Sequence, residues 1–216
     1  MKKLSYVIIA ILTISLSGCS IFQGGNKSFE GVIKYSIDVE GDVDDQTMAA
    51  LPTGVTEYYK GTSFRKDQES LSYSIGVITK GETGETIMLM DIPMMGQKIA
   101  YKQSKEEIEE AKAEMEDNKP EISETGETKE ILGYTCKKAD VMIGDDIYPV
   151  YYTTEITLDS NPNENGMFEG IEGVILEYTV NQQGIVMHFT ATEVEKEKVP
   201  ATTFEIPGDY DVKTAE

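Results

Sequence analysis

Tryptophan is absent from this sequence of 216 residues, and histidine occurs once, as His188. Cysteine is nearly absent too, with only Cys19 and Cys136. Hydrolytic metal sites and activated thiols both depend on histidine, so these chemistries have few residues available. The sequence also contains no GxSxG elbow, no P-loop and no HExxH motif. We therefore predict that the protein is not an enzyme and uses neither a metal nor a cofactor.

Basic residues are scarce: 19 lysines and arginines stand against 39 aspartates and glutamates, and the net charge is −20. Phosphate recognition needs the opposite sign, so the charge excludes nucleic acid as a partner. Anionic membrane surfaces should repel the folded part for the same reason. The charge is typical of a soluble surface, and it also allows docking to a protein partner in the cell envelope.

One long apolar run stands out, Tyr6–Leu16, and it follows Lys2 and Lys3. It is too short to span a bilayer as a helix, so it indicates a cleaved export signal. The run ends at Leu16-Ser17-Gly18-Cys19, which resembles the bacterial lipobox. That resemblance implies cleavage before Cys19 and lipid attachment to its sulfur, although an ordinary secretory signal remains the alternative.

These features predict three parts of the chain. Residues 1–18 are expected to be a cleaved lipoprotein signal peptide, residues 19–28 a lipidated tether, and residues 29–216 a single domain. More than one acyl chain gives durable membrane anchoring. We therefore predict a lipid-anchored protein of the bacterial cell envelope that faces the periplasm, with the outer membrane favoured over the inner one.

Cys136 is the only cysteine left once Cys19 carries lipid, so no disulfide can form within the chain. A catalytic thiol would need a base, and His188 lies in an apolar-alternating run typical of a strand. We interpret Cys136 as a small buried apolar residue.

Alternating apolar and polar residues predict strands along most of the chain. They include one strand over Val55–Arg65, the pairs Thr86–Ile92 with Lys98–Lys102 and Val174–Val180 with Ile185–Glu195, and a last short strand over Thr203–Ile206. The clearest pair is Tyr134–Met142 and Tyr148–Glu155, which flank Gly144-Asp145-Asp146 and form a hairpin that we place at the centre of the sheet. One clear helix is predicted over Lys105–Asp117, after a capping box of Ser104 and Glu107. There is no βαβ rhythm. The predicted fold class is mainly β: a strongly curved antiparallel sheet, an open half-barrel, with one or two helices on its concave side or rim.

A curved sheet needs filling, by side chains or by a ligand. Methionine is adaptable packing at surfaces that meet apolar ligands, and strand aromatics can line the same hollow, although ordinary core packing explains both. We predict an apolar ligand, such as a lipid or acyl chain, bound in this hollow. The candidate contacts are Tyr58, Tyr59, Phe64, Met88, Met90, Met94 and Met95.

The segment around residues 161–172 partly matches a calcium-binding loop. Asparagine stands at the first position where the ion prefers a carboxylate, Pro162 follows it, and predicted strands flank the segment in place of helices. We interpret it as a surface loop whose asparagines and glycines form turns.

Five stretches of the mature chain together match a known pattern: Phe29–Gly31, Gly133–Ala139, Tyr152–Ile156, Gly170–Tyr178 and Val199–Pro207. With them the chain resembles an uncharacterised lipoprotein family, the domain-of-unknown-function family 4412, and less closely the GLPGLI proteins. The resemblance implies a fold like that of the lipoprotein carriers LolA and LolB, and brings no catalytic residues. The resulting hypothesis is a membrane-anchored lipoprotein that binds an apolar ligand; the alternative is an accessory envelope protein that docks a partner through its acidic surface and has no cavity.

Overall fold

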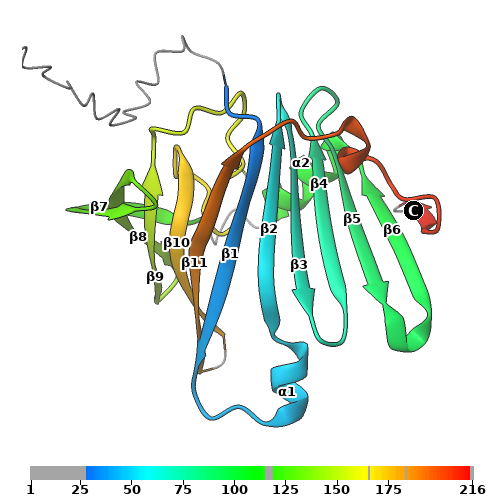
Figure 1. The fold of residues 1–216 in the computed structure, drawn as a ribbon, viewed down its shortest axis with the longest axis horizontal. Helices are drawn as coiled ribbons and strands as arrows, with labels where there is room; N and C mark the ends of the chain where they lie inside the picture. The colour runs from blue at the N-terminus through cyan, green and yellow to red at the C-terminus, as the bar shows by residue number, and fades with distance from the viewer. Residues whose placement is uncertain (1–27, 115–118, 165, 183, 215–216) are drawn as a thin grey trace, which may run out of the picture.

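A single sheet of 12 strands forms the body of the protein, as shown by a computed structural model (Figure 1). The residues it describes are 28–114, 119–164, 166–182 and 184–214. The sheet does not close into a barrel, because β7 (Glu121–Ile131) and β12 (Asp211–Thr214) form its two edges. The prediction of a mainly β fold is therefore confirmed.

Neighbouring strands are mostly consecutive in the chain, so most of the sheet is built from hairpins. The order across the sheet is β12-β6-β5-β4-β3-β2-β1-β11-β10-β9-β8-β7. The bounds of the ten strands between the edges are β1 (Gly31–Glu40), β2 (Pro52–Lys60), β3 (Ser63–Ser70), β4 (Ser74–Lys80), β5 (Glu85–Ile92), β6 (Gln97–Gln103), β8 (Tyr134–Ile143), β9 (Asp146–Thr153), β10 (Val174–Gln182) and β11 (Ile185–Lys196).

The centre of the sheet is the antiparallel pair of β1 and β11, which joins the two ends of the folded chain. Its register runs from Gly31 opposite Lys196 to Glu40 opposite Val186. The expectation that the β8–β9 hairpin is central is wrong: the hairpin forms with the predicted pairing, but only β7 lies beyond it at that edge. Local turn signals predict hairpins well, whereas the position of a hairpin in a sheet depends on long-range pairing.

Three local predictions differ from the structure. The run Val55–Arg65, read as one strand, is interrupted by a turn at Gly61, whose φ of 57° suits glycine. A short 3-10 helix, η3 (Ala201–Phe204), replaces the strand expected near Thr203. β12 was not predicted, and it pairs parallel with β6, so the sheet is not entirely antiparallel. Its four residues are all exposed, which leaves no apolar alternation to detect.

The half of the sheet formed by β2 to β6 has two different faces. One face is covered by the C-terminal segment, where Val199 and Phe204 pack over Ile78, Ile87 and Leu89 in a buried cluster. The opposite face is lined by the alternate residues of the same strands. We call it the cavity face, because a cavity described below opens on it.

A second, larger core cluster fills the space against β1 and β8 to β11. It includes Ile33, Cys136, Val150 and Leu176, each with 0% exposed side-chain surface. The prediction that Cys136 is buried is confirmed. Burial, and to a smaller extent the nearby Glu155 carboxylate, raises the pKa of its thiol to about 11, so the thiol stays protonated.

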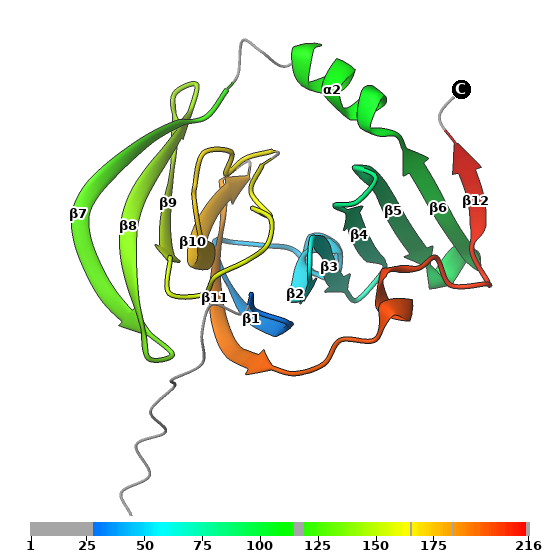
Figure 2. The ribbon, with the colours of Figure 1, turned by 90° about the horizontal axis from the view of Figure 1, so that it is seen from above.

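Two short α-helices complete the structure, α1 (Asp45–Ala50) and α2 (Lys105–Glu114). Asp44 caps α1 by accepting hydrogen bonds from the amides of residues 46 and 47, and the predicted capping box begins α2. Figure 2 shows α2 on the open side of the arc of strands, between β6 and β7. Neither helix, nor any other helix in the described residues, is long and apolar enough to cross a membrane.

Candidate functional site

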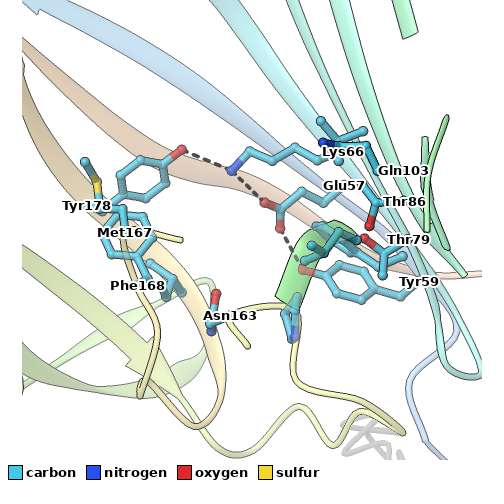
Figure 3. A pocket seen from close by; sticks show the side chains of 15 residues that line it. Glu57, Tyr59, Lys66, Thr79, Thr86, Gln103, Asn163, Met167, Phe168 and Tyr178 are labelled. Atoms are coloured by element: carbon cyan, nitrogen blue, oxygen red, sulfur yellow. Dashed lines mark hydrogen bonds and ion pairs between the residues drawn. The ribbon is translucent and has the colours of Figure 1, made fainter. Parts of the chain in front are cut away.

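A cavity of about 350 Å³ lies where a loop after β9 folds back over the cavity face (Figure 3). Its lining combines aromatic and aliphatic side chains with hydroxyl, amide and charged groups from β2 to β6, α2, the loop and β10. The lining residues are Glu57, Tyr59, Phe64, Lys66, Val77, Thr79, Thr86, Gln103, Ile108, Pro162, Asn163, Met167, Phe168, Ile175 and Tyr178.

An ion pair of Glu57 and Lys66 lies at one wall of the cavity. The two residues face each other across β2 and β3, and Lys66 Nζ lies 3.1 Å from Glu57 Oε1. Lys66 Nζ also lies 3.4 Å from the Tyr178 hydroxyl on β10, to which it donates. Burial opposes the charge of Lys66, but Glu57 and Tyr178 outweigh it and raise the pKa of the ammonium group above its usual value. Lys66 therefore carries its positive charge at neutral pH.

Two buried tyrosines hold the other oxygen of the Glu57 carboxylate. Tyr59 donates to Oε2 at 2.6 Å. The Tyr35 hydroxyl lies 3.0 Å from Oε2 and 2.8 Å from the carbonyl oxygen of Ile175, so its single proton is shared between two acceptors. These contacts connect β1, β2 and β10, and they make the site part of the core between the two halves of the sheet.

The same contacts predict that stability falls at alkaline pH. Burial first, and then the Glu57 carboxylate, raise the pKa values of Tyr35 and Tyr59 well above 10.0. Above that pH the unfolded tyrosines lose protons that the folded ones keep, so unfolding is favoured by up to about 1.4 kcal/mol per tyrosine for each pH unit. The charged form of Lys66 is lost in the same direction, as pH rises through its elevated pKa.

Urea denaturation at about pH 8 and about pH 11 measures this effect, and tyrosinate absorbance of the native protein counts the tyrosines that have ionised. We expect a lower free energy of unfolding at the higher pH, with part of the tyrosine absorbance appearing only on unfolding. Equal stability at both pH values, or complete ionisation in the native state, would contradict the assignment.

The loop after β9 is held in place by asparagine side chains. The Asn161 and Asn163 amides donate to the carbonyl oxygen of Ile171 at 3.0 Å and 3.2 Å, and Asn163 donates to that of Gly173 at 2.9 Å. Those amides are thus used to fold the loop against buried Ile171. Among the residues that the structure describes, no group of three His, Cys, Asp or Glu side chains that could hold a metal ion occurs. The hydrogen bonds of Asn161 and Asn163 give these two residues a structural role in folding the loop.

Aromatic rings form the side of the cavity that faces β10. Phe168 meets Tyr178 edge-to-face at 5.1 Å, and Tyr178 stacks on Phe189 at 4.4 Å. On the opposite wall Phe64 lies 5.2 Å from Tyr59. Such rings offer flat apolar surfaces beside the polar groups of the Glu57–Lys66 pair.

Beyond the cavity, the cavity face continues as an uncharged apolar surface. The strand register aligns Lys66 with Val77, Val77 with Met88, and Met88 with Tyr101, so one row crosses from the ion pair to the apolar side chains. A second row places Ile75, Met90 and Ile99 side by side. We call these six partly exposed residues the apolar patch: Ile75, Val77, Met88, Met90, Ile99 and Tyr101.

The candidate contacts predicted from the sequence are separated by the structure. Tyr59 and Phe64 line the cavity, and Met88 and Met90 belong to the apolar patch. Tyr58 points to the opposite face, where it packs against the cluster under the C-terminal segment. Met94 and Met95 lie in η1 (Pro93–Met95), at the exposed turn between β5 and β6.

Most of the cavity lining was not predicted from the sequence, including Glu57, Lys66, Asn163, Phe168 and Tyr178. They come from β2, β3, the loop after β9 and β10, and no motif connects them. The lipid-attachment prediction at Cys19, with the signal peptide and most of the tether, falls outside the described residues, and it stays a prediction.

The architecture defines a β-sheet domain with a lined cavity, and the comparisons with known proteins assign it to a family. Residues 86–211, more than half of the chain, match the family model described as "N-glycanase peptide, N-terminal domain". The chain belongs to this family. No curated protein matches the chain.

Two solved structures share the fold, both of PNGF-II. For the structure in space group C2, the TM-score is 0.54 and the sequence identity is 16%. The match covers 88% of this chain and 31% of the PNGF-II chain. For the structure in space group P21, the TM-score is 0.53 and the sequence identity is 16%. The match covers 87% of this chain and 32% of the PNGF-II chain. The chain therefore spans about a third of the length of these proteins.

These findings overturn the resemblance drawn from the sequence. The chain is a member of the N-glycanase N-terminal domain family, and not of the domain-of-unknown-function family 4412 or the GLPGLI proteins, and its structural neighbours are not LolA-like. The motifs that suggested the other families are short stretches of glycine, aromatic and β-branched residues at strand ends. Many antiparallel sheets need such residues, so they indicate the fold class and do not identify a family.

Proposed function

We propose that this domain is a non-enzymatic binding domain for a small amphipathic molecule, which lies with its apolar part on the apolar patch and its polar part in the cavity. This binding mode requires a sheet that is curved strongly enough for the cavity face to form a hollow. The observation that supports it is the continuity of the apolar patch with the lined cavity across neighbouring strands.

The polar groups of the cavity favour binding over catalysis. Glu57 is occupied by Lys66 and two tyrosine hydroxyls, which leaves it poorly suited to proton transfer. Among the described residues that line the cavity, Glu57 is the only carboxylate. The family that the chain belongs to is described as the N-terminal domain of an N-glycanase, and we propose no reaction for this domain by itself.

A Met88→Glu substitution tests the role of the apolar patch. Covering a methionine side chain contributes about 1.5–3 kcal/mol to burial, so a charge at this position should weaken binding of the neutral fluorescent probe phenylnaphthylamine at least about tenfold. The matched control is Met94→Glu, because Met94 is 91% exposed at a turn away from the apolar patch. Equal affinities of both variants and the parent protein, or no binding of the probe to the parent, would refute the proposal.

A second candidate function is glycan binding. The matched family is named for an N-glycanase, and the cavity offers aromatic faces beside hydroxyl and amide groups. A titration in which a free N-glycan binds while phenylnaphthylamine does not would favour this candidate. Docking of an envelope protein through the acidic surface, the alternative from the sequence, stays a prediction that cellular crosslinking can test.

A further inference from the structure

The charges in the cavity point to the chemistry of the polar part of the ligand. Of the 15 lining residues that the structure describes, only Glu57 and Lys66 are charged, and they pair with each other. An anionic group bound beside Lys66 would also lie against the Glu57 carboxylate, and a cationic group beside Glu57 would lie against the Lys66 ammonium. Either charge would have to lose its water without gaining a free counter-charge, which is unfavourable.

The ion pair nevertheless retains hydrogen-bonding capacity. Lys66 has three N–H groups, of which Glu57 and Tyr178 use two. Glu57 Oε1 receives Lys66 and can accept one further hydrogen bond, whereas Oε2 already contacts two tyrosines. A ligand group placed here must accept a hydrogen bond from Lys66 and donate one to Glu57. A hydroxyl group does both, whereas a carboxylate or phosphate ester oxygen only accepts.

The rest of the polar lining consists of neutral groups. Thr79, Thr86 and Gln103 form one row across β4, β5 and β6, next to Phe64 on β3. Asn163 faces this row from the loop, as Figure 3 shows. The two threonine hydroxyls and the Gln103 amide can both donate and accept, whereas Asn163, whose amide N–H groups bind Ile171 and Gly173, can only accept. This combination suits a head group with several hydroxyls.

We infer that the cavity selects an uncharged head group that carries several hydroxyls, attached to the apolar part held by the apolar patch. This inference rests on the proposed binding function. The geometry behind it is the row in which Glu57, Lys66, Val77 and Met88 follow one another across four strands, so the neutral pair lies directly beside the apolar patch.

Isothermal titration with three amphiphiles whose unbranched alkyl chains are nearly equal in length tests the inference, each used below its critical micelle concentration. They are dodecyl glucoside, laurate and dodecyltrimethylammonium, with neutral, anionic and cationic heads. At an ionic strength high enough to screen the net charge of the chain, we expect the glucoside to bind at least about tenfold more tightly than either ion. If laurate or the cation binds as well as the glucoside, in a manner that Met88→Glu weakens, the head-group inference fails while the binding function survives. If none of the three binds, both fail.

A Glu57→Gln substitution supplies a change of specificity that a purely structural role would not produce. Glutamine keeps the size and the acceptor oxygen of Glu57 but leaves Lys66 without its counter-charge. We expect laurate to gain at least about tenfold in affinity relative to the glucoside. Glu85→Gln is the matched control, since Glu85 is ion-paired with Lys80 at 3.0 Å and does not line the cavity. An unchanged ratio in folded Glu57→Gln protein, checked by thermal melting, would overturn the inference.

Discussion

A Gly31→Ala substitution is expected to destabilise the fold by about 3 kcal/mol or more. Gly31 begins β1 at the centre of the sheet, between Lys196 on β11 and Tyr59 on β2. A Cβ atom there would overlap the carbonyl oxygen of Glu195 and lie 2.7 Å from Cζ of Phe29. The backbone oxygen cannot retreat without separating β1 from β11, so the clash acts on the pair that joins the two ends of the folded chain.

Gly54→Ala is the matched control for this prediction. Gly54 also lies in a strand, but a Cβ there would meet nothing nearer than the carbonyl oxygen of Tyr35 at 3.9 Å. We expect a change within about 0.5 kcal/mol, since alanine also restricts the unfolded chain. Urea denaturation of both variants measures the difference. Similar stabilities would mean that β1 and β11 approach each other less closely than described.

A Tyr178→Ala substitution is expected to cost about 3–5 kcal/mol, because it removes a large buried ring from the place where core and cavity meet. Tyr178 is 7% exposed, stacks on Phe189, and meets Tyr35 and Phe168 edge-to-face. Its hydroxyl accepts from Lys66 across the cavity. Truncation therefore leaves a hole between the two halves of the sheet and removes a partner from the partly buried Lys66 ammonium group.

Tyr178→Phe separates these two contributions. Phenylalanine keeps the ring contacts and loses only the hydroxyl, whose hydrogen bond to Lys66 is long at 3.4 Å. We expect a loss within about 1–2 kcal/mol by thermal or urea denaturation. A loss as large as that of Tyr178→Ala would show that the hydrogen bond dominates, and a small loss for both would show that the ring is not tightly packed.

Both predictions concern contacts between residues that are far apart in the chain, and they explain where prediction from the sequence stopped. The hairpin of β8 and β9 was recognised from its turn and its alternating side chains, which are local features. Its place near an edge depends instead on the pairing of β1 with β11, which are separated by most of the chain. Alternation indicates which residues share a face, but not which strand lies next to which.

The candidate site shows the same division. Tyr59 and Phe64 were recognised as exposed to a hollow, but the turn at Gly61 was missed, so their positions opposite each other on β2 and β3 were not predicted. With that turn in place, alternation would also have put Glu57 opposite Lys66. Phe168 carried no such signal, since its contact with the cavity arises from the folding of the loop after β9 over the sheet. Tyr178 carried none either, since it lies on β10 and reaches the cavity through long-range packing.

The sequence by itself determined the mainly β class, most hairpins, the capped helix and the burial of Cys136, because each depends on local periodicity, turn chemistry or composition. Only the tertiary structure decided the strand order, the parallel edge strand and the cavity. The physical reason is that strand pairing and loop packing gain free energy from contacts between distant residues, whose partners the local pattern does not specify. The scarcity of histidine and cysteine limits the side-chain chemistry that the sequence offers. The register of β2 to β6, in contrast, places the Glu57–Lys66 ion pair beside the apolar patch.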